Sequence, residues 1–188
     1  MRFVVVSAIL LGTSLLAANS ASPDGGSVSV KGVHLCCGGC QSIAEDALSD
    51  LDGVTSTSAD LNTKVISFKA ADKKAAEAGI KALAEAGFFG TATFNKEPLE
   101  FPTSGAKKGA KANTITLTNV HLCCTACVTA SQQSLQTVRG VNVIDIDRNE
   151  ETIKLTGDGI SILEAIGALN KAGFYCRLKA PNAEPKKP

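Results

Sequence analysis

The sequence predicts an α+β protein that contains two tandem copies of one βαββαβ unit. Three observations support this fold class. The chain matches itself when it is shifted by 87 residues, both copies show strand-like and helix-like patterns in the same order, and a stretch without apolar periodicity separates them. The strongest match pairs residues 33–40 with residues 120–127, and an Ala-Gly-Phe at 86–88 corresponds to an Ala-Gly-Phe at 172–174.

The first copy begins with a strand, which the alternation of Val28 and Val30 predicts. Residues 54–60 and 64–69 are expected to form a hairpin, and a last strand is expected at about 91–95. Two helices complete the unit. The face of the first helix is predicted to carry Cys40, Ala44, Ala47, Leu48 and Leu51, and that of the second Ala76, Ile80 and Leu83.

The second copy repeats this order with a weaker first helix, since two members of its apolar face are serine. That face is predicted to carry Cys127, Ser131, Ser134, Leu135 and Val138, and the face of the second helix Ile162, Ile166 and Leu169. A last strand is expected at about 175–179. The order β-α-β-β-α-β is that of a ferredoxin-like fold, an antiparallel sheet with both helices on one face.

The two domains are predicted at residues 27–95 and 113–180, with a flexible linker at 96–112 and a disordered tail at 181–188. Residues 1–20 are predicted to be a signal peptide, because Arg2 precedes an apolar run that ends at a small-x-small site. We therefore expect an exported protein, periplasmic or extracellular, with no membrane insertion after cleavage. A retained membrane anchor is the alternative, since the run of about 16 apolar residues is near the minimum that spans a bilayer.

Charge and composition exclude several classes of function. Nineteen basic and eighteen acidic residues give a net charge of +1, and aromatic residues make up 4% of the chain. Nucleic-acid binding is not expected, because it needs a basic surface or stacking aromatic side chains. No Ser-His-Asp set, catalytic carboxylate pair or phosphate-binding glycine loop is present, so hydrolase and kinase activities have no support in the sequence. We expect a protein that is not an enzyme. We also expect a monomer.

Six of the seven cysteines lie in two tight clusters, Cys36, Cys37 and Cys40, then Cys123, Cys124 and Cys127. Each cluster contains a Cys-x-x-Cys pair where the first strand meets the first helix. Helix N-termini stabilise thiolates, and two intervening residues let both sulfurs face one point. Thiolates favour soft ions such as Cu(I), Zn(II), Hg(II) or Cd(II) over Mg(II) and Ca(II). The predicted ligands, for about one ion per domain, are Cys37, Cys40, Cys124 and Cys127.

Each unit resembles a heavy-metal-associated (HMA) domain, the module of copper chaperones, periplasmic mercury-binding proteins and the N-terminal parts of metal-pumping ATPases. The family motif Gly-Met-x-Cys-x-x-Cys corresponds to residues 34–40 and 121–127, with Leu35 and Leu122 in place of methionine. The resemblance implies that Phe88 and Phe174 lie beside the metal loops. It also implies soft-metal binding, with Cu(I) or Zn(II) the leading candidates, and a metal-transport protein as partner.

The loops depart from the family at two positions. His34 and His121 replace glycine, and Cys36 and Cys123 occupy the variable position. These four are further candidate ligands, and their participation would favour zinc, cadmium or lead over linear Cu(I). The alternative is that both histidines point to solvent and both extra thiols are passive, since side chains alternate in direction along an extended segment.

Cys176, close behind the second Ala-Gly-Phe, has no counterpart in the first copy. It is either a further ligand of the second loop or a buried cysteine that packs as a small apolar residue. Two other functions stay open for the whole chain: a thiol-disulfide oxidoreductase, and a structural or interaction module with idle cysteines. Storage and transfer of the metal are both compatible with the sequence.

Overall fold

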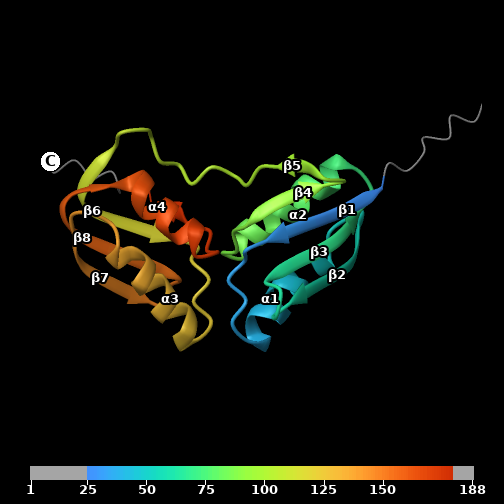
Figure 1. The fold of residues 1–188 in the computed structure, drawn as a ribbon, viewed down its shortest axis with the longest axis horizontal. Helices are drawn as coiled ribbons and strands as arrows, with labels where there is room; N and C mark the ends of the chain where they lie inside the picture. The colour runs from blue at the N-terminus through green and yellow to red at the C-terminus, as the bar shows by residue number, and fades with distance from the viewer. Residues whose placement is uncertain (1–24, 180–188) are drawn as a thin grey trace, which may run out of the picture.

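The computed structural model describes residues 25–179, which form two domains side by side with a connecting segment that runs along one edge of both (Figure 1). The predicted signal peptide and tail lie outside the described residues. Within residues 25–179, no helix has both the length and the apolar character that a membrane crossing requires.

The first domain has the predicted order of elements and one additional strand. Its elements are β1 (Gly26–Lys31), α1 (Gly38–Ser49), β2 (Val54–Asp60), β3 (Val65–Ala70), α2 (Lys73–Glu85), β4 (Thr91–Phe94) and β5 (Glu97–Leu99). The strands form an antiparallel sheet in the order β2-β3-β1-β4-β5. The first four strands are arranged as in a ferredoxin-like fold, and β5 extends the sheet at its edge.

The second domain repeats the fold without a fifth strand. Its elements are β6 (Lys111–Thr118), α3 (Thr125–Gln136), β7 (Val141–Asp147), β8 (Thr152–Ser161), α4 (Ile162–Lys171) and β9 (Arg177–Leu178). The sheet order is β7-β8-β6-β9, which matches that of the first domain strand for strand. The predicted fold class, two tandem ferredoxin-like βαββαβ domains, is confirmed.

The first helix of each domain packs by the face that the periodicity predicted. Helix α1 buries Cys40, Ala44 and Leu48, and α3 buries Cys127, Ser131 and Leu135. Both helices therefore place the last cysteine of the loop on the buried face, at its N-terminal end. The apolar core thus holds Cys40 and Cys127 in place, and neither is exposed to solvent.

The connecting segment is more structured than the flexible linker that the sequence predicted. Strand β5 pairs with β4, and Lys111 already belongs to β6. Beyond β5, Phe101 packs against Phe89 with ring centroids 4.8 Å apart, and the Tyr175 hydroxyl donates a hydrogen bond to the Thr103 carbonyl at 3.2 Å. The periodicity did not reveal β5 because three residues, one of them proline, are too few to show alternation.

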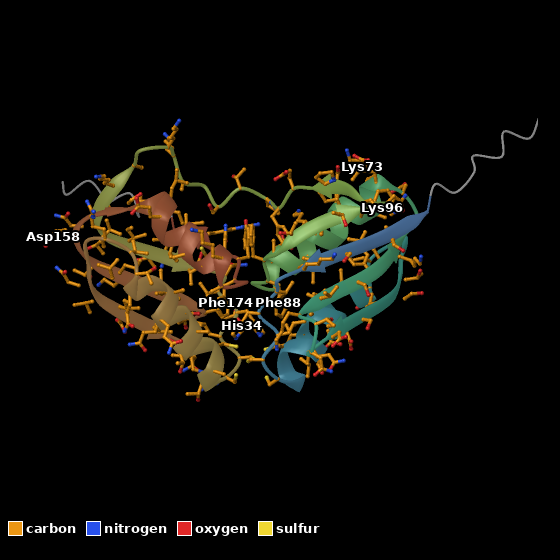
Figure 2. All side chains as sticks on the ribbon, viewed as in Figure 1. His34, Lys73, Phe88, Lys96, Asp158 and Phe174 are labelled. Carbon is orange, nitrogen blue, oxygen red and sulfur yellow. The ribbon has the colours of Figure 1, made fainter. Side chains whose placement is uncertain are left out.

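The domains meet through the backbone that follows the last helix of each. Phe88 and Phe174 form an antiparallel bridge. The Tyr175 N–H donates to the Gly87 carbonyl at 2.9 Å, and the Phe89 N–H donates to the Gly173 carbonyl at 3.1 Å. Figure 2 shows Phe88 and Phe174 at the centre of the molecule, where the two domains touch. Equivalent segments thus contact each other, and the pairing brings the two cysteine loops to the same side of the contact.

Candidate metal centre

Each cysteine loop ends at the N-terminus of a helix, and the two loops have nearly the same geometry. Cys37 and Cys124 are the N-cap residues, with φ/ψ of −154°/171° and −145°/172°. Neither accepts a side-chain capping bond from the first turn. The first N–H groups of each helix are therefore available to thiolates, which the positive end of the helix dipole also favours.

The two loops face each other, and their six sulfurs form one group, called the six-thiol cluster below. Within the loops, the Sγ–Sγ distances are 3.5 Å for Cys36–Cys40, 3.7 Å for Cys37–Cys40, 3.6 Å for Cys123–Cys127 and 3.8 Å for Cys124–Cys127. Between the loops, they are 3.4 Å for Cys36–Cys124 and Cys40–Cys123, 3.5 Å for Cys36–Cys127, and 3.9 Å for Cys37–Cys123 and Cys40–Cys127. All six thiols are free. The four predicted ligands and the two extra thiols thus lie together.

The two histidines turn toward this cluster, each against the phenylalanine of the other domain. The ring of His34 stacks on Phe174 with centroids 4.3 Å apart, and the ring of His121 packs on Phe88 at 4.4 Å. His121 is only 2% exposed. The buried Nε2 atoms of both histidines have no hydrogen-bond partner among residues 25–179. The alternative in which both histidines point to solvent is therefore wrong.

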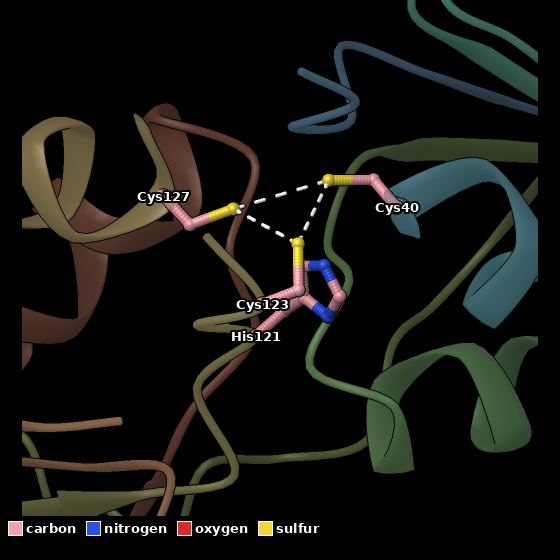
Figure 3. A group of neighbouring side chains, drawn as sticks. All are labelled: Cys40, His121, Cys123 and Cys127. Atoms are coloured by element: carbon pink, nitrogen blue, oxygen red, sulfur yellow. Dashed lines mark hydrogen bonds between the residues drawn. The ribbon is translucent and has the colours of Figure 1, made fainter. Parts of the chain in front are cut away.

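His121 lies close enough to the sulfurs to share an ion with them. One of its ring nitrogens and the sulfurs of Cys40, Cys123 and Cys127 all lie within 4.8 Å of one another. Figure 3 shows this group, with Cys40 reaching in from the first domain and the other three from the second. His34 belongs to a corresponding group with Cys36 and Cys127. The structure thus brings all eight candidate ligands to the contact between the domains.

Two glycines permit this close approach. Gly87 and Gly173 have φ of 80° and 87°, a conformation that side chains with a Cβ rarely adopt. A Cβ on Gly87 would lie 2.4 Å from the backbone N of His121, and one on Gly173 would lie 2.3 Å from the backbone N of His34. The Ala-Gly-Phe repeat therefore places each phenylalanine beside the opposite metal loop, where the resemblance had implied only a position beside a loop.

One basic side chain from each hairpin turn holds the start of a cysteine loop, a role that the sequence did not predict. The Lys64 ammonium donates to the Leu35 carbonyl. The Arg148 guanidinium donates to the carbonyls of Leu122 at 3.2 Å and Cys123 at 2.8 Å. The two residues do not align in the repeat, since Arg148 corresponds to Leu61. The only signal in the sequence is that each turn, 61–64 and 148–151, contains one basic residue.

Burial keeps much of the metal-free cluster in its neutral form. Loss of solvent raises the pKa of Cys36 to about 12 and raises the pKa of Cys123 and Cys127. Cys124 is different, because the backbone N–H groups of Cys127 and Ala126, at the N-terminus of α3, lie near its sulfur. Their effect outweighs that of its slight burial and lowers its pKa to about 6. The pKa of His121 is lowered to about 4 by burial and by the neighbouring His34. A cation that displaced the thiol protons would supply the positive charge that these groups lack.

Cys176 lies apart from the cluster. It is fully buried in the core of the second domain, and burial raises its pKa to about 12. None of the potential metal-binding groups among residues 25–179 includes it. Its position is that of a cysteine packed as a small apolar residue.

The fold and the cysteine loops together define a protein with tandem ferredoxin-like domains and thiol-rich loops. Several solved structures match parts of this chain. Oxidized MerP from Ralstonia metallidurans CH34 matches 38% of this chain over 100% of its own length, with 25% identity and a TM-score of 0.34. The apo HMA domain of the copper chaperone for superoxide dismutase matches 49% of the chain over 99% of its own length, with 19% identity and a TM-score of 0.33.

Another solved structure matches a larger share of the chain. The N-terminal soluble domains of Bacillus subtilis CopA cover 88% of this chain and 99% of their own length, with 19% identity and a TM-score of 0.32. No family model matches the sequence, and no curated protein is significantly similar to it. All three TM-scores are below 0.5, and the fold assignment depends on the strand order described above.

Proposed function

We propose that this chain is an exported, non-enzymatic carrier that binds a soft metal ion through its two cysteine loops. The observation that supports this function best is the six-thiol cluster, in which Sγ–Sγ distances of 3.4–3.9 Å link both Cys-x-x-Cys pairs. Thiolates bind Cu(I), Zn(II), Cd(II) and Hg(II) in preference to hard cations. Two imidazoles at the edge of the cluster add nitrogen ligands, which suits zinc and cadmium.

The placement of the outer cysteines supports transfer as well as storage. Cys37 and Cys124 are partly exposed, whereas Cys40 and Cys127 are buried. An ion can therefore meet an accessible thiol first and then a protected one. The reverse path would pass the ion to the cysteines of a metal-transport protein by thiolate exchange.

The first experiment is an anaerobic titration of the reduced chain with Cu(I) and with Zn(II) against competing chelators, in which bound ions and free thiols are counted together. We expect tight binding that consumes thiols and releases protons, and the ion held more tightly identifies the cargo. Replacing Cys37, Cys40, Cys124 and Cys127 by serine should abolish binding. Cys176→Ser is the matched control, because it removes a cysteine outside the cluster. Equal binding by the quadruple variant would overturn the proposal.

One observation favours a second function, thiol-disulfide exchange. The lowered pKa of Cys124 and its partial exposure are properties of a nucleophilic cysteine. The same preparation tests this function by oxidation with glutathione disulfide and by reduction of a disulfide substrate. Catalytic turnover that depends on Cys124, together with failure to bind either ion, would replace the metal-carrier proposal by the redox one.

A further inference from the structure

We propose that the two domains build one binuclear metal site, in which the sulfurs of Cys40 and Cys127 each bridge two divalent ions. This inference rests on the proposed function. It replaces one ion in each domain by two ions that the domains hold together. The sequence predicted about one ion per domain. The structure instead places ligands of both domains around each ion, so that neither domain holds a complete site.

The first ion lies between Cys40, His121, Cys123 and Cys127. The three sulfurs are separated by 3.4, 3.6 and 3.9 Å. A tetrahedral ion with Zn–S bonds of about 2.3 Å requires ligand sulfurs about 3.8 Å apart. The fourth ligand is the His121 ring, whose nitrogen lies within 4.8 Å of all three sulfurs. The group therefore has the number and type of ligands that a closed zinc or cadmium site needs, and its three sulfurs have the spacing of such a site.

The second ion lies in the group that the internal repeat relates to the first. Exchanging the domains converts the first group into Cys127, His34, Cys36 and Cys40. Their sulfurs are separated by 3.5 Å for Cys36–Cys40, 3.5 Å for Cys36–Cys127 and 3.9 Å for Cys40–Cys127. A ring nitrogen of His34 lies within 4.8 Å of the sulfurs of Cys36 and Cys127. The spacing of the three sulfurs thus occurs twice, while the His34 nitrogen lies near two of the three sulfurs and the His121 nitrogen near all three.

Both groups contain Cys40 and Cys127, which is why the ions must share them. Two four-coordinate ions need eight ligand positions, and four cysteines with two histidines supply eight only when two sulfurs each bind both ions. The charges also balance, since four thiolates and two divalent cations sum to zero. A buried site without net charge avoids the large desolvation cost of an uncompensated ion. Binding breaks four S–H bonds and releases four protons to solvent.

The two bridging sulfurs have the environment that this role requires. Cys40 and Cys127 are both 0% exposed, at the centre of the domain contact. Cys37 and Cys124 lie outside both groups, 3.7 Å from Cys40 and 3.8 Å from Cys127. They are placed to contact an arriving ion and pass it to the bridging pair.

The test is a titration of the reduced chain with ¹¹³Cd(II), followed by cadmium NMR. Two bound ions should give two resonances that are coupled to each other, because a bridging sulfur connects the nuclei through bonds. Cys40→Ser in the first domain and Cys127→Ser in the second should each lower the affinity for both ions by at least tenfold. Cys176→Ser is the control for loss of a thiol, because Cys176 lies outside the cluster, and it should retain the coupled pair of resonances.

The outcomes separate this inference from the proposed function. If Cys40→Ser leaves one ion bound to the second domain with its original affinity and resonance, the sites are independent and the shared site is overturned, while metal binding stands. Two uncoupled resonances in the unmodified chain would overturn it equally, whether or not the variants fold. If the unmodified chain binds no Cd(II), Zn(II) or Cu(I), the proposed function itself fails.

Discussion

The two domains carry the same ligands but support them differently. Each supplies one histidine and three cysteines at equivalent positions, with N-cap geometries that agree within 10°. Away from the ligands the copies diverge. The first helix buries Ala44 in one domain and Ser131 in the other, and Cys176 stands where the first domain has Gly90. The two domains thus have the same ligands and the same loop geometry at the cluster, whereas the side chains in their cores differ.

The histidines show the same contrast in their surroundings. His121 is buried, whereas His34 is partly exposed. Partial burial, together with the nearby charge of Lys64, lowers the pKa of His34. The basic side chains differ too, since Arg148 holds two loop carbonyls and Lys64 holds one. The second loop is thus the more enclosed and the more firmly held.

The largest expected effect comes from separating the domains. Gly173→Ala imposes about 1–2 kcal/mol for a left-handed alanine and also a clash with the backbone of His34, 2.3 Å from the new Cβ. We expect the contact to open, with a larger radius of gyration in small-angle scattering and loss of shared metal binding. Gly105→Ala is the matched control, because Gly105 has φ of 83° and open space around its Cβ position. A compact Gly173→Ala variant would show that the contact tolerates displacement.

The next effect is a pH dependence of stability in the metal-free protein. The pKa of His121 is about 4 in the folded protein, and an unfolded histidine has a pKa of about 6.5. As pH falls below about 6.5, His121 is protonated in the unfolded state but stays neutral in the folded state. Stability should therefore fall between about pH 6.5 and pH 4, by an amount on the order of 3 kcal/mol.

Urea unfolding of the reduced protein at pH 7 and pH 4.5 measures this loss. His121→Gln should remove most of it, and His34→Gln should remove less, because His34 is less buried. If His121→Gln left the pH dependence of the free energy of unfolding unchanged, the conclusion that the His121 imidazole is buried and neutral would be contradicted.

A smaller effect tests the difference between the helices. The Ser131 hydroxyl is buried and has no hydrogen-bond partner within residues 25–179. Ser131→Ala should therefore stabilise the second domain by about 1 kcal/mol, since an unsatisfied buried polar group costs about 1–3 kcal/mol. Ala44→Ser, the reciprocal change, should destabilise the first domain by a similar amount. Urea midpoints of the metal-free proteins measure both, and a destabilising Ser131→Ala would indicate a bound water.

The smallest effect concerns the basic residues beside the loops. Arg148→Ala should weaken Cd(II) binding by less than about tenfold, because exposed charges act through a solvent-screened interaction of about 1 kcal/mol. Lys64→Ala should weaken it less, since Lys64 holds a single carbonyl. Chelator competition at low and high salt measures both. The reverse order of effects would contradict the conclusion that the second loop is the more firmly held.

The element order and the identity of the candidate ligands could be predicted from sequence because both are local. The 3.6-residue spacing of Cys40, Ala44 and Leu48 defines a buried helical face whatever lies on the far side of the domain. The internal repeat then transfers that prediction to the second copy. Strand β5 was not predicted, because three residues are too few to show the alternation of apolar and polar side chains that marks a strand. Its pairing with β4 also depends on the rest of the sheet being formed.

The meeting of the two loops was decided only by the tertiary structure. Sequence alone determined that each domain has a thiol-rich loop at a helix N-terminus, and it left the loops as separate sites with histidines of undecided direction. Backbone pairing at residues 87–89 and 173–175 brings the loops together. Main-chain hydrogen bonds of this kind form between residues far apart in the chain and depend little on side-chain type, so no spacing or periodicity in the sequence records them. The shared cluster is therefore a property of how the domains dock.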